Sequence, residues 1–258
     1  MKFNVLTLFP ELIENVFLNS ITGRAADKGI IELNTVNIRD YSKDKHKKVD
    51  DYIYGGGAGM LMFPQPVYDA YLSLKPKSTT RVIYLTPGGK TFTQDMAKEY
   101  AKEEELIFLC GHYEGIDERV IDKIVTDKVS IGDYVLTGGE IPCLVMMDSI
   151  SRMIPGVLGN DESFVEESFY DNLLEYPQYS RPDKWMDMEV PKILLSGDHK
   201  KIEEYRLEES LRITKELRPD LYDKWAKDHP EYFEKLKKKL KKAEEKRRKE
   251  EAKRLANK

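Results

Sequence analysis

One stretch of the chain, residues 111–142, gathers glycines, tyrosines and acids in two short loops. The first reads GHYEGIDER over residues 111–119, and the second reads SIGDYVLTGGEIP over residues 130–142. The two loops contain five glycines, and glycine lets backbone approach a ligand without a Cβ in the way. An apolar run typical of a strand leads into each loop. The pattern predicts a ligand cradle made largely of main chain.

The elements that must position this cradle alternate between strands and helices. Strands are expected at residues 2–8, 31–38, 81–86, 106–110 and 129–131, and helices at 10–19, 66–74, 93–103, 116–124 and 140–154. Residues 106–110 are wholly apolar, as in a strand buried on both faces. This alternation is typical of an α/β domain with a mainly parallel sheet. The loops after residues 86, 110 and 131 then lie at the carboxyl ends of strands, where such folds bind ligands.

The composition changes after Pro155. Residues 156–187 carry acids, aromatics and prolines with little periodicity, which is typical of a linker or of a segment that becomes ordered on binding. Asp198 can cap a helix that ends near Leu217, and Pro219 can begin another. We therefore expect a sheet domain over residues 1–159, a linker over 160–192, a helical domain over 193–234 and a charged helical tail over 235–258.

The net charge of −4 alone argues against a nucleic-acid partner, but the charges are segregated. The tail carries 13 Lys and Arg against 4 Glu, a local net of +9, which leaves −13 on the preceding residues. Residues 39–48 form a second basic cluster. Segregation of this kind is compatible with RNA contact at chosen places, and equally with a solvated tail.

The same composition bears on location. No apolar run approaches the roughly 20 residues that a membrane-spanning helix needs. The first strand is followed by no signal-peptide cleavage site. We therefore expect a cytoplasmic protein with no membrane partner.

Several familiar kinds of active site are disfavoured. The four histidines have no metal-ligand spacing, no Gly-x-Gly-x-x-Gly motif opens a helix after the first strand, and no serine occupies a nucleophile elbow. Cys110 and Cys143 both lie in apolar segments and are expected to be buried core thiols. By elimination, carboxylates, an arginine and a bound reactive cofactor would carry the chemistry.

Long motifs extend this pattern from residue 1 to about residue 220. They are LFPE at 8–11, TGRA at 22–25, VDD at 49–51, YGGG at 54–57, MLM at 60–62, YLTP at 84–87, both cradle loops, DSISR at 148–152, IPGVLG at 154–159 and LLSG at 194–197. On these motifs the sequence resembles the bacterial tRNA (guanine-37-N1)-methyltransferases, enzymes of the SPOUT class that use S-adenosyl-L-methionine. The tail after about residue 230 carries no family signal.

The resemblance implies a fold and a set of partners. It implies a deep trefoil knot in the parallel-sheet domain, a small helical C-terminal domain that binds tRNA, and an obligate homodimer with active sites at the subunit interface. S-adenosyl-L-methionine would bind bent in the knot, and family activity also involves Mg2+, although no carboxylate cluster here announces a dedicated metal site. By position, the cofactor would contact Tyr84, Leu85, Thr86, Pro87, Gly111, Tyr113, Glu114, Gly115, Ile131, Gly132, Tyr134, Leu136, Gly138, Gly139 and Pro142.

Methyl transfer to guanine N1 requires removal of the N1 proton and stabilisation of negative charge on O6. The smallest set of groups that can do this is a carboxylate base and a cation near O6. The family places its base in a linker Asp-Ser-Phe. The aligned residues here are Glu167, Ser168 and Phe169, so this carboxylate is one methylene longer. The resemblance makes Glu167 the base, with Glu166 as the nearest alternative.

The other candidate residues also have ordinary structural interpretations. The resemblance places Arg152 beside O6, but on sequence alone it could pair with Asp148 one helical turn away. The resemblance also places Asp50 near the charged end of the cofactor and Glu114 near the cofactor or the guanine. On sequence alone, each of these two residues could be a solvated acid. The two cradle tyrosines could be core aromatics.

Three functions remain open at this point. The leading one is methylation of guanosine-37, 3′ of the anticodon, with residues 39–48 and the C-terminal domain on the tRNA backbone. The second is a catalytically silent RNA-binding relative, supported only by the change to Glu167. The third is a SPOUT methyltransferase that acts on another RNA.

Overall fold

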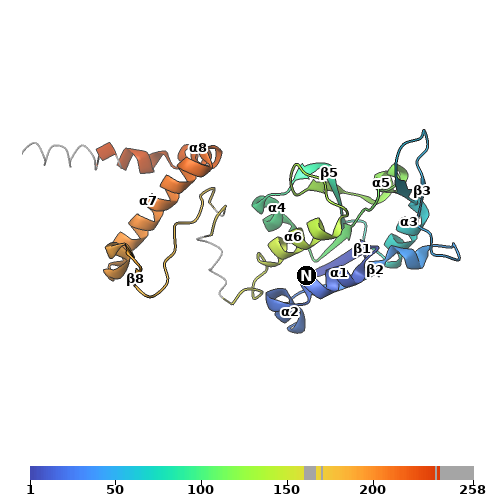
Figure 1. Ribbon diagram of the computed structural model, residues 1–258, viewed down its shortest axis with the longest axis horizontal. Coiled ribbons are helices and arrows are strands. Elements are labelled where there is room, and N and C mark those ends of the chain that lie inside the picture. The colour runs from blue at the N-terminus through green and yellow to red at the C-terminus, as the bar shows by residue number, and fades with distance from the viewer. Residues whose placement is uncertain (160–166, 170, 236, 239–258) are drawn as a thin grey trace, which may run out of the picture. The chain divides into compact units, whose positions relative to one another are not determined.

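The chain divides into two compact units, Met1–Phe164 and Val165–Lys258, in the computed structural model. The structure describes residues 1–159, 167–169, 171–235 and 237–238. The first unit combines strands and helices, and the second combines helices with a short hairpin (Figure 1). Within the described residues, no helix is long and apolar enough to span a bilayer.

A five-stranded sheet forms the centre of the first unit (Figure 1). Its strands are β1 (Lys2–Thr7), β2 (Glu32–Asn37), β5 (Arg81–Thr91), β6 (Glu105–Leu109) and β7 (Asp127–Ser130). They lie in the order β2-β1-β6-β5-β7, and each neighbouring pair is parallel. The predicted α/β domain with a mainly parallel sheet is confirmed.

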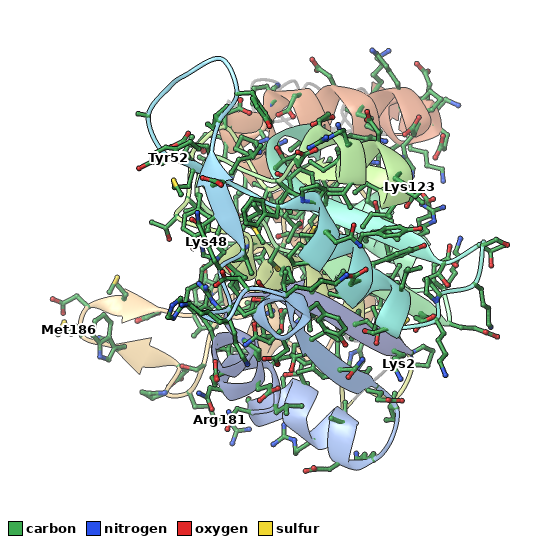
Figure 2. The ribbon with its side chains drawn as sticks, turned by 90° about the vertical axis from the view of Figure 1, so that its right-hand side faces the viewer. Lys2, Lys48, Tyr52, Lys123, Arg181 and Met186 are labelled. Atoms are coloured by element: carbon green, nitrogen blue, oxygen red, sulfur yellow. The ribbon has the colours of Figure 1, made fainter. Side chains whose placement is uncertain are left out.

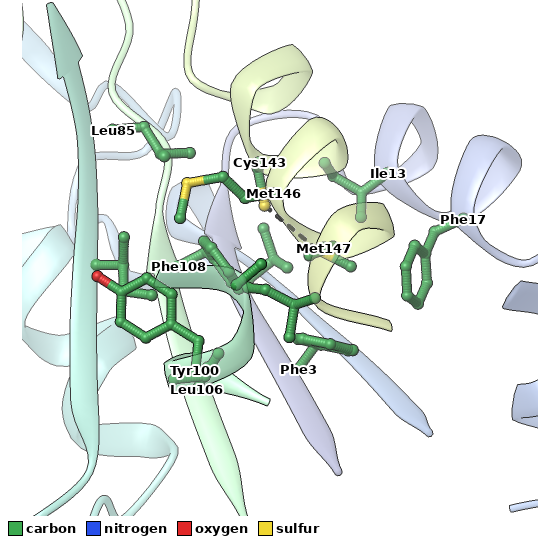
Figure 3. Close-up of a cluster of buried hydrophobic side chains, with 14 of the residues drawn as sticks. Phe3, Ile13, Phe17, Leu85, Tyr100, Leu106, Phe108, Cys143, Met146 and Met147 are labelled. Carbon is green, nitrogen blue, oxygen red and sulfur yellow. Dashed lines mark hydrogen bonds between the residues drawn. The ribbon is translucent and has the colours of Figure 1, made fainter. Parts of the chain in front are cut away.

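Helices cover both faces of this sheet. They are α1 (Pro10–Phe17), α2 (Ser20–Asp27), η1 (Ile38–Tyr41), α3 (Pro64–Ser73), α4 (Gln94–Tyr100), α5 (Glu118–Ile124) and α6 (Glu140–Ser151). Alternate residues of a strand point to opposite faces, so Phe3 and Phe108 meet α1, α4 and α6 on one side (Figure 3). Leu6 and Leu109 meet α3 and α5 on the other. Two apolar layers therefore hold β6 buried on both faces, as its wholly apolar sequence predicts.

Three features of the first unit differ from the sequence prediction. A separate helix, α2, follows α1. Strand β5 continues to Thr91, where a loop is predicted from Pro87. Leu85 and Lys90 both pair with Val129, so the residues between them form a bulge that absorbs the turn without leaving the sheet. Strands β3 (Asp50–Tyr52) and β4 (Met60–Met62) form an unpredicted antiparallel hairpin around the glycine-rich loop, with Tyr52 near its tip (Figure 2).

The second unit is built on helices α7 (His199–Leu217) and α8 (Pro219–Asp228). The side chain of Asp198 accepts a 3.3 Å hydrogen bond from the backbone N–H of Lys201, which caps α7 as predicted. The unit also contains β8 (Lys184–Trp185), β9 (Met188–Glu189) and η2 (Lys192–Leu195). Met186 lies at the tip of the β8–β9 hairpin (Figure 2).

Candidate functional site

A pocket of about 230 Å³ lies in the first unit, beside the bulge of β5 and the carboxyl ends of β6 and β7. Every residue predicted to contact the cofactor lines this pocket. The lining also includes His112, Val129, Ser130, Val135 and Thr137. The β5 bulge and the two glycine loops, which are separate in sequence, therefore converge on one cavity, as the glycine pattern predicts. The occupant of the cavity stays a prediction.

Close packing of main chain shapes the pocket floor. The backbone N–H of Gly139 donates a 2.9 Å hydrogen bond to the carbonyl oxygen of Gly111, and His112 bridges antiparallel to Gly138. A Cβ added to Gly139 would lie 2.7 Å from the Cα of Cys110. Only glycine therefore fits at position 139 without moving the backbone of the neighbouring loop.

Three tyrosines border the pocket in different environments. Tyr84 is 8% exposed, and its ring occupies the space that a side chain on Gly111 would need. Burial raises the pKa of Tyr84 above its ordinary value. Tyr113 and Tyr134 are 47% and 54% exposed, so their interpretation as core aromatics is wrong. Both offer ring surface to the pocket.

A buried hydrogen-bonded pair stands behind the first cradle loop. Glu140, at the start of α6, is 3% exposed and lies 2.6 Å from Nε2 of His112. The hydroxyl of Thr7 donates to the other carboxylate oxygen at 2.6 Å. Both carboxylate oxygens of Glu140 therefore have a hydrogen-bond partner, one in β1 and one in the first loop. The ring of His112 also packs on Phe9, with centroids 4.9 Å apart. This network ties β1, the first loop and α6 together.

The β3–β4 hairpin is attached to the same loop. The backbone N–H of Glu114 donates to the carbonyl of Met60, and that of Met62 donates to the carbonyl of Gly115, both at 3.0 Å. The side chain of Glu114 packs across Gly59, where a Cβ would collide with it. Asp50 is half-buried and pairs with Met62 in the hairpin. Both predicted acids thus lie on segments joined to the cradle.

The two predicted catalytic residues lie apart in sequence and in different units. Arg152 ends α6 in the first unit, is half-buried, and donates its backbone N–H to the carbonyl of Asp148 at 3.1 Å. Glu167 belongs to the second unit, where it lines a pocket of about 210 Å³ with residues of α7. Glu166, the alternative base, lies outside the described residues.

The two cysteines and the possible metal ligands bear on the sequence predictions. Cys110 and Cys143 are free and buried, which confirms the prediction. Burial raises the pKa of the Cys110 thiol well above its ordinary value, so this group is held as an inert thiol. Across the described ranges, no three His, Cys, Asp or Glu side chains come together in a way that could hold a metal ion. No ligand set for the Mg2+ of the resemblance is therefore assigned.

Comparison with known proteins identifies the family of this chain. Residues 1–224 match the family described as tRNA (Guanine-1)-methyltransferase TrmD. This chain belongs to that family. A relative from Clostridioides difficile (strain 630) is 61% identical over 227 residues, which cover 87% of this chain and 98% of the relative. One from Clostridium perfringens (strain SM101 / Type A) is 58% identical over 224 residues, 87% of this chain and 94% of the relative. One from Lachnospira eligens is 56% identical over 235 residues, 90% of this chain and all of the relative.

All three relatives are named tRNA (guanine-N(1)-)-methyltransferase. The predicted family and the predicted class of enzyme, a methyltransferase acting on tRNA, are confirmed. In this family member the sequence prediction missed His112 and Glu140. Four scattered histidines carry no signal of partnership, because His112 and Glu140 are 28 residues apart and meet only through the fold. Their places at the edges of the two glycine loops were the available clue.

Proposed function

We propose that this chain transfers the methyl group of S-adenosyl-L-methionine to N1 of guanosine-37 in tRNA, in the cytoplasm. The observation that carries the proposal is the single pocket onto which residues 84–87, 111–115 and 131–142 converge. Family membership supplies the reaction class and the kind of RNA. The position of the guanosine, 3′ of the anticodon, follows from the resemblance.

The pocket suits a small ligand with many hydrogen-bonding edges. Its lining is rich in glycine, so backbone N–H and C=O groups can reach the adenine and ribose edges of a cofactor. Gly138 and Gly139 have no room for a side chain, and the exposed ring faces of Tyr113 and Tyr134 offer stacking surface. When bound, S-adenosyl-L-methionine supplies an electrophilic methyl group on a positively charged sulfur.

The chain's own groups manage the proton and the charge of the guanine. Glu167 accepts the N1 proton and leaves N1 with a lone pair for the methyl group that the bound cofactor would supply, with the electron pair of the broken methyl–sulfur bond remaining on the sulfur. Arg152 stands beside O6 and stabilises the negative charge that builds there. Glutamate in place of the family's aspartate keeps the carboxylate and adds reach. Its role as base is supported by its position in the Glu-Ser-Phe segment and by family membership.

We propose that the backbone of the first unit is threaded as a trefoil knot. The segments that would form it press against each other without side chains between them. Gly139 bonds to Gly111, and the backbone of Gly89 in the β5 bulge packs against that of Val129. These backbone contacts, one between the two glycine loops and one between β5 and β7, support the proposal.

A second copy of the chain is the proposed partner of the α1–α6 face. Helices α1 and α6 pack beside each other and bury Ile13 and Met147 inward. Each outer side exposes an apolar pair at i, i+4 spacing, which is Leu12 and Val16 on α1 and Ile141 and Val145 on α6; Val16 is 56% and Val145 46% exposed. Apolar residues gathered on one face mark an association surface. Val16→Asp with Val145→Asp should turn a dimer into a monomer in light scattering, whereas an unchanged mass would contradict this interface.

The RNA-binding surface is proposed to include residues 39–48 and the second unit. Lys47 pairs with Asp40 at 2.6 Å and Lys48 with Asp51 at 3.5 Å, so these two lysines already have acidic partners. Lys43 and Lys45 are exposed and are the first candidates for phosphate contact. Replacing both with Ala should weaken tRNA binding and make it less dependent on salt.

The decisive experiment is a methylation assay with tRNA transcripts that carry guanosine or adenosine at position 37, followed by mapping of the modified nucleotide. Product on the guanosine transcript at position 37 alone supports the proposal. No product from the wild-type chain would favour the silent RNA-binding relative, and product elsewhere would favour a methyltransferase for another RNA.

The base has its own test within the same assay. Glu167→Gln should abolish turnover while the affinity for S-adenosyl-L-methionine, measured by calorimetry, stays near that of the wild type. Glu167→Asp is the matched control, because it keeps the carboxylate and restores the family's usual length. Retained turnover in Glu167→Gln would move the base elsewhere.

A further inference from the structure

A buried tryptophan in the second unit holds a residue close to the proposed base. Trp225, on α8, is 3% exposed, and its indole Nε1–H donates a 3.0 Å hydrogen bond to Oδ2 of Asp171. The ring of His229 stacks on the indole with centroids 4.3 Å apart and planes 15° apart. Nε2 of His229 lies 3.8 Å from the same Asp171 oxygen. Asp171 follows Glu167 by four residues.

The segment between Glu167 and Glu175 is folded back on itself by local bonds. The backbone N–H of Phe169 donates to the carbonyl of Leu173 at 2.8 Å. The backbone N–H of Glu175 donates to the hydroxyl of Ser168 at 2.9 Å. The segment carrying the proposed base is therefore a closed turn rather than an extended strand.

This turn is fastened to the helices of its own unit at several points. The backbone N–H of Leu174 donates to the hydroxyl of Thr214, a fully buried residue of α7, at 2.8 Å. The guanidinium of Arg218 lies over the ring of Phe169, 5.9 Å from its centroid. The bond from Trp225 is the attachment to α8. Each attachment restricts a residue within seven positions of Glu167.

We infer that Trp225 and Asp171 are positioning residues for the methyl-transfer step: their hydrogen bond fixes the turn that presents Glu167. The inference rests on the proposed role of Glu167 as base. A base acts well only when its turn is held in one geometry, since misplacement by about 1 Å can cost about a hundredfold in rate. The second unit then contributes to the chemical step by ordering the proton acceptor, in addition to any contact with RNA.

Core packing is the competing explanation for Trp225. Its indole also meets the rings of Tyr232 and Phe233 edge-on, with centroids 5.4 and 6.1 Å away. A ring that only fills space, however, has no need of the indole N–H. Phenylalanine retains most of the packing and removes the donor, so Trp225→Phe separates the two explanations.

The test compares turnover with binding in full-length protein. Trp225→Phe and Asp171→Ala should each lower kcat about tenfold, with the Kd for S-adenosyl-L-methionine and the KM for tRNA within about twofold of wild type. Asp171→Asn should recover most of the turnover, because its amide oxygen still accepts from the indole. The double variant should be no slower than either single variant, because both remove the same bond.

The chain offers a matched control for the substitution itself. Trp185, the other tryptophan of the chain, is 60% exposed, so Trp185→Phe should leave the bond between Trp225 and Asp171 intact and is the reference variant. This variant also leaves Trp225 as the sole indole. In that background, Asp171→Ala should shift the Trp225 emission, which reports loss of the bond without any assay of activity.

The outcomes separate this inference from the proposed function. If Glu167→Gln is inactive while Trp225→Phe and Asp171→Ala turn over at the wild-type rate, the positioning role is wrong and the base stands. Losses that add in the double variant, or that asparagine fails to restore, would also overturn it. Turnover retained by Glu167→Gln would overturn the proposed base and this inference together, even where the fluorescence shift shows the bond.

Discussion

Replacing Gly139 with alanine tests whether the pocket floor depends on direct contact between two backbones. Gly139 has φ of −82°, a value that alanine adopts readily, so the substitution adds no backbone strain. The new Cβ would lie 2.7 Å from the Cα of Cys110, 3.0 Å from the backbone nitrogen of Gly111 and 3.1 Å from the Cβ of Cys110. None of these atoms belongs to a flexible side-chain end, so the loop itself must move.

The size of the effect follows from these distances. Carbon atoms in contact prefer about 3.5–4.0 Å, so the two loops must separate by roughly 1 Å. That movement stretches the 2.9 Å hydrogen bond from Gly139 to Gly111 beyond useful length. Overpacking typically costs about 1–3 kcal/mol, and a lost hydrogen bond adds about 1 kcal/mol. We expect the free energy of unfolding to fall by about 2–4 kcal/mol in total.

The same movement should reach the ligand. Gly111 and Gly139 both line the pocket, and a loss of about 1.4 kcal/mol in binding corresponds to a tenfold rise in Kd. Gly139→Ala should therefore raise the Kd for S-adenosyl-L-methionine at least tenfold in calorimetry. Gly88→Ala is the matched control, because an added Cβ there meets nothing within 4 Å. Equal stability and equal affinity in the two variants would refute the reasoning.

Three further changes have expected outcomes. Glu140→Gln should lower the free energy of unfolding in urea by about 1–3 kcal/mol, because one of the two oxygens that bond to Thr7 and His112 becomes an NH2 group, which cannot accept a hydrogen bond; no change would contradict the tie between loop and helix. Asp117→Ala removes the N-cap of α5 at a cost of about 1 kcal/mol. A hydrogen bond from Arg119 lowers the pKa of Asp117. The stability lost in Asp117→Ala should therefore be full above about pH 4 and should shrink as the pH falls through the lowered pKa. A stability difference between wild type and Asp117→Ala that does not change with pH down to about pH 2 would contradict this reasoning. Deleting residues 235–258 should leave most methylation activity, and a large loss would show that the tail contacts RNA.

The sheet and the pocket could be predicted because their signals are local. The strand over 106–110 is uniformly apolar, and its burial on both faces follows directly from that composition. Glycines at the ends of two strands announce close approach of backbone, and the structure brings those loops together at one pocket. The prediction erred at β5, where Pro87 and two glycines indicate a loop, because a bulge can absorb such residues while the strand stays paired with β7.

Features that depend on long-range partners could not be predicted from the sequence in the same way. Neither His112 nor Glu140 has a neighbour in sequence that signals their contact. Asp171 and Trp225 are 54 residues apart, and an isolated tryptophan near the end of a charged helix indicates only an apolar core. Such pairs form when separate elements fold against each other, and a single sequence carries no record of that distance.

The residues proposed to bind the methyl donor and the residue proposed to accept the proton belong to different compact units. This division predicts how substitutions in the two units should combine. Gly139 shapes the proposed cofactor pocket of the first unit, whereas Asp171 and Trp225 are the proposed positioning residues for the turn of the base in the second. Changes at two sites that share no partner usually combine additively within about 0.5 kcal/mol. Gly139→Ala should therefore act on the Kd for the cofactor and Trp225→Phe on kcat, and a double variant should show both effects at full size. A double variant much less impaired than this sum would mean that cofactor binding itself orders the base, and the two units would then be one catalytic element rather than two.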